Sequence, residues 1–277
     1  MLHLLCINFV VESIEKFITD GWAIVNIPDT SAVNSAIEDL EAEAYRLTGA
    51  SVPLSELLRY ITDFDHFHLS MANYFWEREH GMRIAATCLP VLKDFIGLDI
   101  LVQYKPYLRI SRPGMAEDNI GYHKDTQYGQ LPYEIALHVP FVALDEKSSM
   151  RVISGSHLLH EGKFTSAAAQ QQARDGIKHT LGYPYSPKRL NVPDGAVMQS
   201  LSMKVGQMAI FTPALFHGQE INEGENTRIS IDLRVVNKFR CPADKIGKGQ
   251  NQYQPVANSP CETLATRYYE AQNDQTR

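Results

Sequence analysis

The 277-residue sequence has few of the features that mark several common protein classes. Its four cysteines lie far apart and form no Cys-x-x-Cys pair, which argues against a zinc ribbon or a disulfide-stabilised scaffold and favours a cytoplasmic location. The formal net charge is −6 and no cluster of Lys or Arg occurs, so we expect neither nucleic acid nor an anionic membrane surface as a partner. This composition favours a small-molecule substrate and leaves the oligomeric state open.

Long apolar runs and phosphate-binding loops are also missing. The apolar residues 1–11 are too few to span a bilayer, and they carry neither a basic leader nor a small-residue cleavage site. No internal repeat occurs, and no glycine-rich loop of the dinucleotide or nucleotide type. With 44% hydrophobic residues, the chain is long enough for a single soluble domain with a substantial core.

Three residues that are present could form a metal site. His123 and Asp125 are two residues apart, so on a strand both side chains would point to the same face. His217, brought alongside, would complete a facial set of two imidazoles and one carboxylate. This donor set suits Fe(II), because it leaves up to three coordination positions open for substrate and oxygen, whereas a structural zinc site closes all four.

Arg228 follows His217 in the segment Thr227-Arg228-Ile229-Ser230. A guanidinium can hold one carboxylate of a dicarboxylate bidentately while the other end of that molecule chelates the iron. The sequence therefore predicts 2-oxoglutarate as a cosubstrate.

Taken in order, these residues resemble the Fe(II)/2-oxoglutarate-dependent oxygenases and, among them, the phytanoyl-CoA dioxygenase-like branch. An isolated His-x-Asp is weak evidence, but the ordered set, which spans residues 100–236, is specific. Ser154 stands where the family usually has proline, and His157 resembles a structural residue rather than a ligand. The resemblance rests on His123-x-Asp125, His217, Arg228 with Ser230, the stretch 150–157 (Met-Arg-Val-Ile-Ser-Gly-Ser-His) and the stretch 206–211 (Gly-Gln-Met-Ala-Ile-Phe).

The resemblance implies a double-stranded β-helix, a cupin-like jelly roll, that uses Fe(II), 2-oxoglutarate and O2. His123, Asp125 and His217 would bind the iron, and Arg228 with Ser230 would bind 2-oxoglutarate, which is converted to succinate and CO2. The family's halogenases lack the carboxylate that Asp125 provides here. Hydroxylation of an unactivated C–H bond, or a related desaturation or cyclisation, is therefore expected, on a small polar biosynthetic metabolite of natural-product, saccharide or amino-acid type.

Apolar periodicity predicts a mainly β fold with N-terminal helices, that is, an α+β fold. Alternation at Ile100, Val102 and Tyr104 indicates a strand, and the nearby Pro106 and Pro113 favour an edge or bulged strand over a central one. Helices are expected at 31–47 with Ser31 as N-cap, at 54–60, at 68–79, and at 82–96 with an interruption at Pro90.

We expect one domain in three parts. Residues 1–99 would form a helical buttress and residues 100–240 the jelly-roll core, with an insertion at 158–195. Residues 241–277 would form a C-terminal extension that carries a short helix at 262–271 and no chemistry.

Two strands are expected to present polar side chains to a cavity. In residues 228–236 the even-numbered positions Arg228, Ser230, Asp232 and Arg234 share one face, on which Asp232 and Arg234 could form an ion pair or join a network. The alternative is an edge strand whose polar face lies in solvent. In residues 134–144, His138 points away from the apolar face. Candidate substrate contacts are Tyr107, Arg109, Gln127, Tyr128 and His138, each of which could also be an ordinary polar residue of the barrel.

The polar insertion at 158–195 could cap the site or only decorate the surface. It offers Tyr183, Tyr185, Lys188 and Arg189 as contacts for a polar substrate. Two other functional classes stay open. A jelly-roll metalloenzyme that does not use 2-oxoglutarate would keep the metal ligands and tolerate loss of Arg228, and a non-catalytic jelly-roll binding protein would tolerate loss of the ligands as well.

Overall fold

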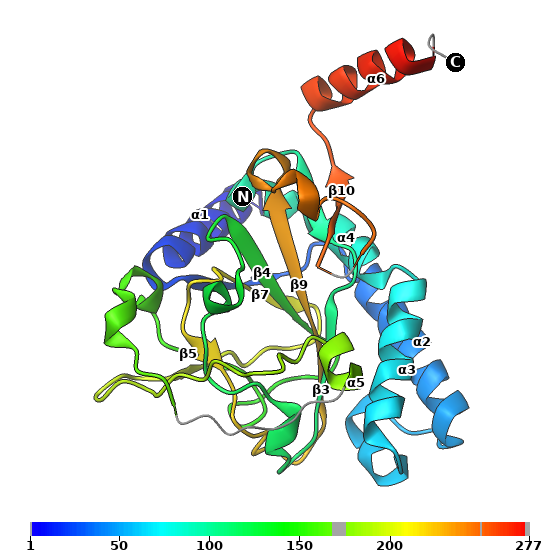
Figure 1. Ribbon diagram of the computed structural model, residues 1–277, viewed down its shortest axis with the longest axis vertical. Coiled ribbons are helices and arrows are strands. Elements are labelled where there is room, and N and C mark those ends of the chain that lie inside the picture. Colours follow the sequence, from blue (N-terminus) through cyan, green and yellow to red (C-terminus); the bar gives the residue numbers. More distant parts are fainter. Residues whose placement is uncertain (1, 168–175, 250, 275–277) are drawn as a thin grey trace.

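The computed structural model describes residues 2–167, 176–249 and 251–274, which form an α+β fold rich in antiparallel strands (Figure 1). The helices are α1 (Leu2–Asp20), α2 (Ser31–Thr48), α3 (Phe64–Glu77), α4 (His80–Ile96), α5 (Gly176–Thr180) and α6 (Pro260–Asp274). The strands are β1 (Trp22–Asn26), β2 (Ile100–Gln103), β3 (Tyr107–Ser111), β4 (Glu134–Pro140), β5 (Arg151–Val152), β6 (Gln199–Ser200), β7 (Gln207–Phe211), β8 (His217–Gly218), β9 (Arg228–Asn237) and β10 (Tyr253–Ala257).

The main sheet is built around β9. Its strands follow the order β1-β7-β4-β9-β2-β10, and β3 also pairs with β9. Because β9 has ten residues, its first half pairs with β3 and its last residues pair with β2, while β4 runs along its other side. The strand predicted at Ile100 to Tyr104 is β2, which is not an edge strand because β9 and β10 flank it, although its pairing with β10 has an irregular register.

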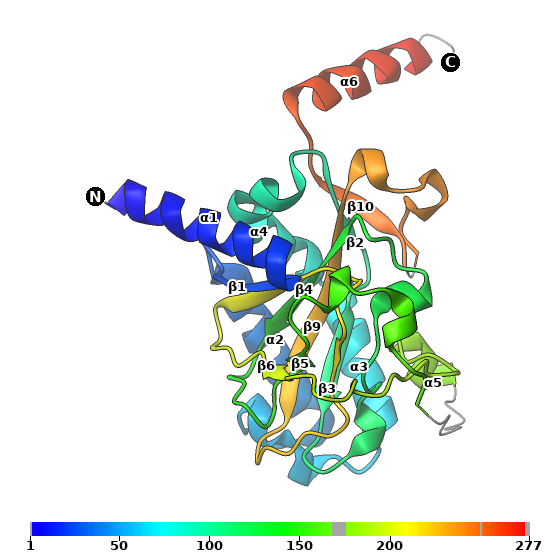
Figure 2. The same cartoon turned by 90° about the vertical axis from the view of Figure 1, so that its left-hand side faces the viewer.

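Helices α2, α3 and α4 lie together on one face of the main sheet (Figures 1 and 2). The odd-numbered residues of β9, from Ile229 to Val235, are fully buried in the core under these helices. Their even-numbered neighbours point to the other face, as the period of a strand requires. The alternation predicted from sequence is thus confirmed.

A small sheet packs against that other face. Its strands follow the order β6-β5-β8, and single bridges at His123–His217 and Leu144–Met203 extend the pairing. Between the two sheets lies a second apolar cluster to which Ala136 and Phe211 contribute from the main sheet and Val152 from the small one. The molecule is therefore layered, with helices, a large sheet and a small sheet in that order.

The predicted helices are present, although the one at 54–60 is a 3₁₀ helix (Leu54–Tyr60). Two further corrections concern particular residues. Ser31 is not the N-cap of α2. Thr30 holds that position without a side-chain hydrogen bond, and the Asp29 carboxylate accepts from the Ser31 N–H. Helix α4 continues through Pro90, which was expected to interrupt it. Pro90 and Ala86, whose carbonyl loses its partner, are both exposed, where a missing backbone hydrogen bond costs least.

The predicted α+β class is confirmed, while the more specific jelly roll and the tripartite division of the domain stay predictions. Residues 168–175 of the predicted insertion, which include Gln170 to Gln172, lie outside the described residues. Within the described residues, none of the helices is long and apolar enough to cross a membrane. Helix α6 projects away from the rest of the molecule in both views (Figures 1 and 2).

Candidate metal centre

Backbone pairing brings the two predicted histidine ligands together. His123 and His217 exchange both backbone hydrogen bonds, with N···O distances of 2.8 and 3.0 Å. Asp125 lies just beyond this bridge and begins the 3₁₀ turn Asp125–Tyr128. The expected strand therefore ends before the carboxylate, but an extended Lys124 still delivers both ligands to the same side.

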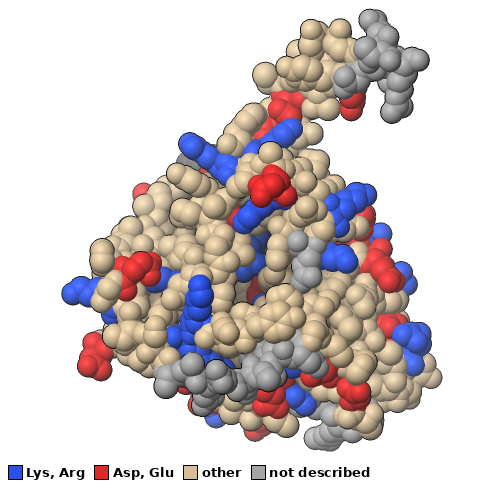
Figure 3. Space-filling view, in the orientation of Figure 1, with Lys and Arg blue, Asp and Glu red and all other residues tan. Residues whose placement is uncertain are grey.

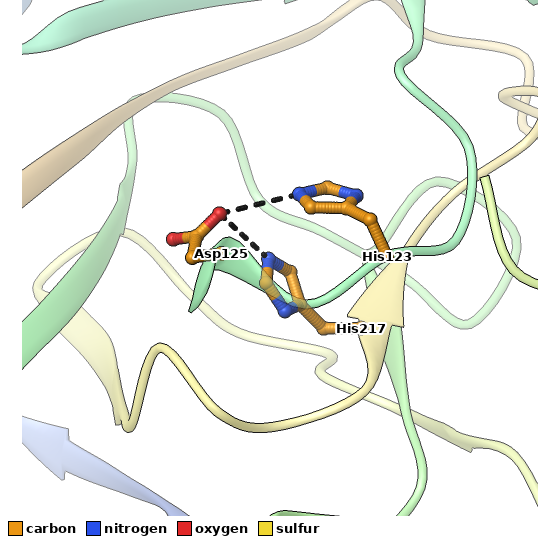
Figure 4. Close-up of side chains that lie close together, drawn as sticks. All are labelled: His123, Asp125 and His217. Atoms are coloured by element: carbon orange, nitrogen blue, oxygen red, sulfur yellow. Dashed lines mark ion pairs between the residues drawn. The ribbon is translucent and has the colours of Figure 1, made fainter. Parts of the chain in front are cut away.

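The imidazole rings are oriented for metal binding. Nδ1 of His123 lies 2.8 Å from the Gly121 carbonyl, and Nδ1 of His217 lies 2.9 Å from the Leu215 carbonyl. Each Nδ1 therefore carries the proton, which leaves both Nε2 lone pairs free. These Nε2 atoms lie 3.3 and 3.8 Å from Oδ1 of Asp125 (Figure 4). All three ligand atoms lie within 4.8 Å of one another, so one ion could reach them all.

Asp125 is held in its ionised form. Its second oxygen, Oδ2, accepts a hydrogen bond of 3.0 Å from Arg234 on β9. Burial alone would raise the pKa of Asp125, but Arg234 and the two imidazoles outweigh it and hold the pKa well below its usual range. Burial, reinforced by His123, lowers the pKa of His217 to about 4, so this imidazole is neutral near pH 7. Both protonation states are the ones that metal binding needs.

The ligands open onto a cavity of about 290 Å³ between the two sheets. The small sheet contributes His123 and His217 to its wall, and the main sheet contributes Arg228, Asp232 and Arg234. The space-filling view shows Lys and Arg side chains around a hollow near the middle of this face (Figure 3). The described cavity wall carries three arginines, Arg109, Arg228 and Arg234, and three aspartates, Asp118, Asp125 and Asp232, so its positive and negative side chains balance.

Arg228 is a buried cation that forms no ion pair with any described carboxylate. Its Nη1 and Nη2 donate only to the amide oxygens of Gln219 and Asn119, and its Nε has no hydrogen-bond partner in the described part of the chain. Arg109 and Arg234, by contrast, each pair with a carboxylate. Burial lowers the pKa of Arg228, but a guanidinium stays charged. The arrangement leaves room for a carboxylate from a ligand.

Ser230, predicted to assist Arg228, is less well placed. Its Oγ is buried and has no hydrogen-bond partner among the described residues. The residue does not belong to the described lining of the cavity, whereas Arg228 does. Its predicted role stays a prediction.

Asp232 and Arg234 do not form the direct ion pair that was one of the two expected arrangements; each instead bonds to other side chains. Asp232 accepts from Arg109 Nε at 2.9 Å and from His138 Nδ1 at 2.8 Å, while Arg234 binds Asp125. Side chains two apart on one strand lie farther from each other than from their cross-strand neighbours. Each charge therefore pairs across the sheet or across the cavity, and not along β9.

Four of the five predicted substrate contacts line the cavity. These are Tyr107, Arg109, Tyr128 and His138. Gln127 instead accepts a hydrogen bond from the Lys124 backbone within the 3₁₀ turn, and the described lining does not include it, so its predicted contact gains no support.

The insertion supplies one wall of the cavity through His179 and Tyr183. The other predicted contacts in this segment serve structural roles. Lys188 and Arg189 donate to the backbone carbonyls of Gln127 and Ile120. Tyr185 is exposed and stacks on His179 at the rim.

Sequence reasoning missed several polar residues of the site. Asn251, in the C-terminal extension that was expected to carry no chemistry, lines the cavity and accepts a hydrogen bond from the Tyr107 hydroxyl. Gln219 and Asn119 hold Arg228. Their positions depend on contacts between distant segments, which no local motif encodes.

Comparison with solved structures shows a shared fold. A non-heme monooxygenase, ThoJ, in complex with nickel is 19% identical, with a TM-score of 0.54 over 90% of this chain and 84% of that one. The non-heme α-ketoglutarate-dependent epimerase SnoN from nogalamycin biosynthesis is 12% identical, with a TM-score of 0.50 over 91% and 95%. Another SnoN structure, in complex with Fe3+, α-ketoglutarate and nogalamycin RO, is 13% identical, with a TM-score of 0.50 over 83% and 84%.

No family model matches the sequence, and no curated protein matches it either. The structural comparison nevertheless shows a fold similar to that of a non-heme monooxygenase and of a non-heme α-ketoglutarate-dependent epimerase. Together with the two histidines and one carboxylate in the cavity, it is consistent with Fe(II), 2-oxoglutarate and O2 as cofactors.

Proposed function

We propose that the protein is an Fe(II)- and 2-oxoglutarate-dependent oxygenase that hydroxylates an unactivated C–H bond of a small polar biosynthetic metabolite. The observation that carries this proposal is the placement of His123, Asp125 and His217 in one cavity with Arg228, a buried guanidinium that has no carboxylate partner among the described residues. The metal ligands alone would fit many reactions. A free buried cation beside them fits a dicarboxylate cosubstrate.

The residues would divide the work as follows. His123, Asp125 and His217 would hold the iron, and Arg234 would fix the orientation of Asp125 through the bond to Oδ2. Iron(II), with 2-oxoglutarate and O2, supplies an oxidant for C–H bonds and releases succinate and CO2. Arg228 would hold the distal carboxylate of 2-oxoglutarate, with Gln219 and Asn119 keeping its guanidinium in place. The walls of the cavity would position the substrate carbon and exclude water.

The finer assignments rest on sequence. The order of the motifs supports the phytanoyl-CoA dioxygenase-like branch, and the two packed sheets support a jelly-roll core. Asp125, ionised and bound to Arg234, occupies the position that the family's halogenases leave open for halide. Hydroxylation, or a related oxidation without halide, is therefore the proposed outcome.

Anaerobic titration tests this proposal. Metal-free protein would receive Fe(II) and then 2-oxoglutarate while the visible metal-to-ligand charge-transfer band is recorded. We expect a saturable band in the wild type, no band with Asp125→Ala, and a band that needs far more 2-oxoglutarate with Arg228→Ala. Arg151→Ala serves as the matched control, because Arg151 pairs with Glu223 away from the cavity.

Other outcomes would identify the rival functions. Iron binding without a band, or with a band indifferent to Arg228, would indicate a metalloenzyme that does not use 2-oxoglutarate. Folded protein that binds no iron would indicate a non-catalytic binding protein.

A further inference from the structure

His138 is a buried side chain in the cavity wall that the proposed metal and 2-oxoglutarate sites do not use. It lies on β4, is 1% exposed, and lines the same cavity as the metal ligands. Its Nδ1 lies 2.8 Å from Oδ1 of Asp232, while Oδ2 of Asp232 accepts from Arg109 at 2.9 Å. Its other nitrogen, Nε2, is buried and has no hydrogen-bond partner in the described part of the chain.

The Asp232 carboxylate determines what Nε2 can do. Burial would raise the pKa of Asp232, but the opposite effect of His138 and Arg109 is larger, and the pKa is lowered. The carboxylate is therefore ionised and can only accept hydrogen bonds. Nδ1 of His138 must therefore carry the proton of this hydrogen bond. In the neutral imidazole, Nε2 is then an acceptor with a free lone pair, locked in place because its ring is tied to β9.

2-Oxoglutarate cannot satisfy this acceptor. As a dianion it offers only acceptor oxygens, which suit the guanidinium of Arg228 and not a second lone pair. The partner of Nε2 must donate an O–H or N–H, and so it has to be a different molecule.

The neighbouring wall combines aromatic surface with polar groups. Tyr107 stands opposite Asp232 in the strand register, and the Arg109 guanidinium lies 4.8 and 4.9 Å from the centroids of the Tyr107 and Tyr183 rings. Phe211 lines the cavity beside Ala136, and its ring packs against His217. The wall around Nε2 is therefore partly apolar, as is usual for small-molecule sites.

We propose that Nε2 of His138 accepts a hydrogen bond from a hydroxyl or N–H group of the substrate, and that His138 thereby selects substrates that carry such a donor. The identification of the bound molecule as the substrate rests on the proposed function. The binding itself requires neither iron nor turnover. The cavity wall then offers one hydrogen-bond acceptor, at His138, and one guanidinium donor, at Arg228.

A pair of probes that differ in one donor tests the inference. Phenol and toluene have similar rings, and only phenol can donate. Their dissociation constants would be measured by NMR titration of the full-length, metal-free protein, so that phenol cannot ligate an ion. We expect the wild type to prefer phenol, and His138→Phe, which keeps a ring and removes the acceptor, to weaken phenol binding about tenfold with toluene changed less than twofold.

A second variant and a second signal protect the test against misfolding. His138→Gln retains an acceptor oxygen and should keep part of the preference for phenol. In wild-type protein labelled with ¹⁵N-histidine, phenol should shift the unprotonated Nε2 signal of His138. Equal phenol affinity in the wild type and in a folded His138→Phe, or an Nε2 signal unchanged by saturating phenol, would overturn the inference. Because no iron is present, failure here is distinct from failure of the charge-transfer titration.

Discussion

His123 and His217, far apart in the chain, are paired through both of their backbone hydrogen bonds, so the sheet itself sets the separation of the two imidazoles. The pairing adds a fourth segment to the small sheet next to β8. The metal site is therefore as rigid as this ladder, and a change that separates the two segments should weaken metal binding even if all three ligands remain.

Gly218 tests this dependence. A Cβ at this position would lie 2.3 Å from the carbonyl oxygen of Gly121, a backbone atom that cannot move aside, and the residue has φ +143°. Gly218→Ala should lower the free energy of unfolding by about 2–3 kcal/mol, because the clash would open the ladder, and should weaken Mn(II) binding more than tenfold. Urea denaturation and metal titration measure the two effects.

Gly114 provides the matched control for this substitution. It also has a positive φ, +74°, but a Cβ there would meet no atom within 4 Å. Gly114→Ala should cost about 1 kcal/mol and leave metal affinity unchanged. Equal losses of metal affinity in the two variants would contradict the role of the ladder.

Arg234 should act as a positioning residue for Asp125. Removing its charge with Arg234→Met leaves the buried carboxylate without its cation, so the pKa of Asp125 should rise and metal affinity should fall by about 10- to 100-fold. Arg234→Lys should recover part of the affinity, and the effect of Arg234→Met should grow as pH falls. If Arg234→Met matched the metal affinity of the wild type at every pH measured, the positioning role would be refuted. Arg151→Ala is the control expected to be unaffected.

His68 should make the stability of the fold depend on pH. This imidazole on α3 is fully buried, and its Nε2 lies 2.8 Å from the Leu108 carbonyl on β3. Burial lowers its pKa from 6.5 to about 3. Between these values the unfolded chain binds the proton and the folded protein does not, so stability falls as pH falls, by up to about 1.4 kcal/mol per pH unit from this group.

Chemical denaturation between pH 7 and pH 4 checks the contribution of His68. His68→Gln removes the titrating group and keeps a donor for the Leu108 carbonyl, so its stability should vary less with pH than that of the wild type. Parallel pH profiles for the two proteins would show that His68 does not contribute.

Ser154 stands where the family that this sequence resembles usually has proline, and it forms two side-chain hydrogen bonds. Its Oγ accepts from the Trp22 indole at 2.8 Å and donates to Gln199 at 2.9 Å. Ser154→Ala and Ser154→Pro should each lower the free energy of unfolding by about 1–2 kcal/mol, because the largely buried indole N–H loses its partner. Ser200→Ala, which removes an exposed hydroxyl, is the control. Unchanged urea midpoints in both Ser154 variants would refute this account.

The sequence predicted those features that depend on local order. Alternation placed the odd-numbered residues of β9 in the core and the even-numbered ones toward the cavity, because a strand has a period of two. Helix α2 followed from apolar residues that recur at steps of three and four between Ser31 and Leu47. The identities and order of His123, Asp125, His217 and Arg228 likewise indicated a metal and a dicarboxylate before any geometry was known.

Only the tertiary structure decided which charges pair and which polar atoms stay free. Asp232 and Arg234 lie close together on one strand. The registers of β3 and β4 with β9 nevertheless place Asp232 beside Arg109 and His138, while Arg234 pairs with Asp125 at the start of the 3₁₀ turn. Asn251 reaches the cavity because β10 adds to β2 at the end of the main sheet. Such partners are set by registers between distant segments, and the energy of a buried charge depends on those partners, so no reading of local sequence could assign them.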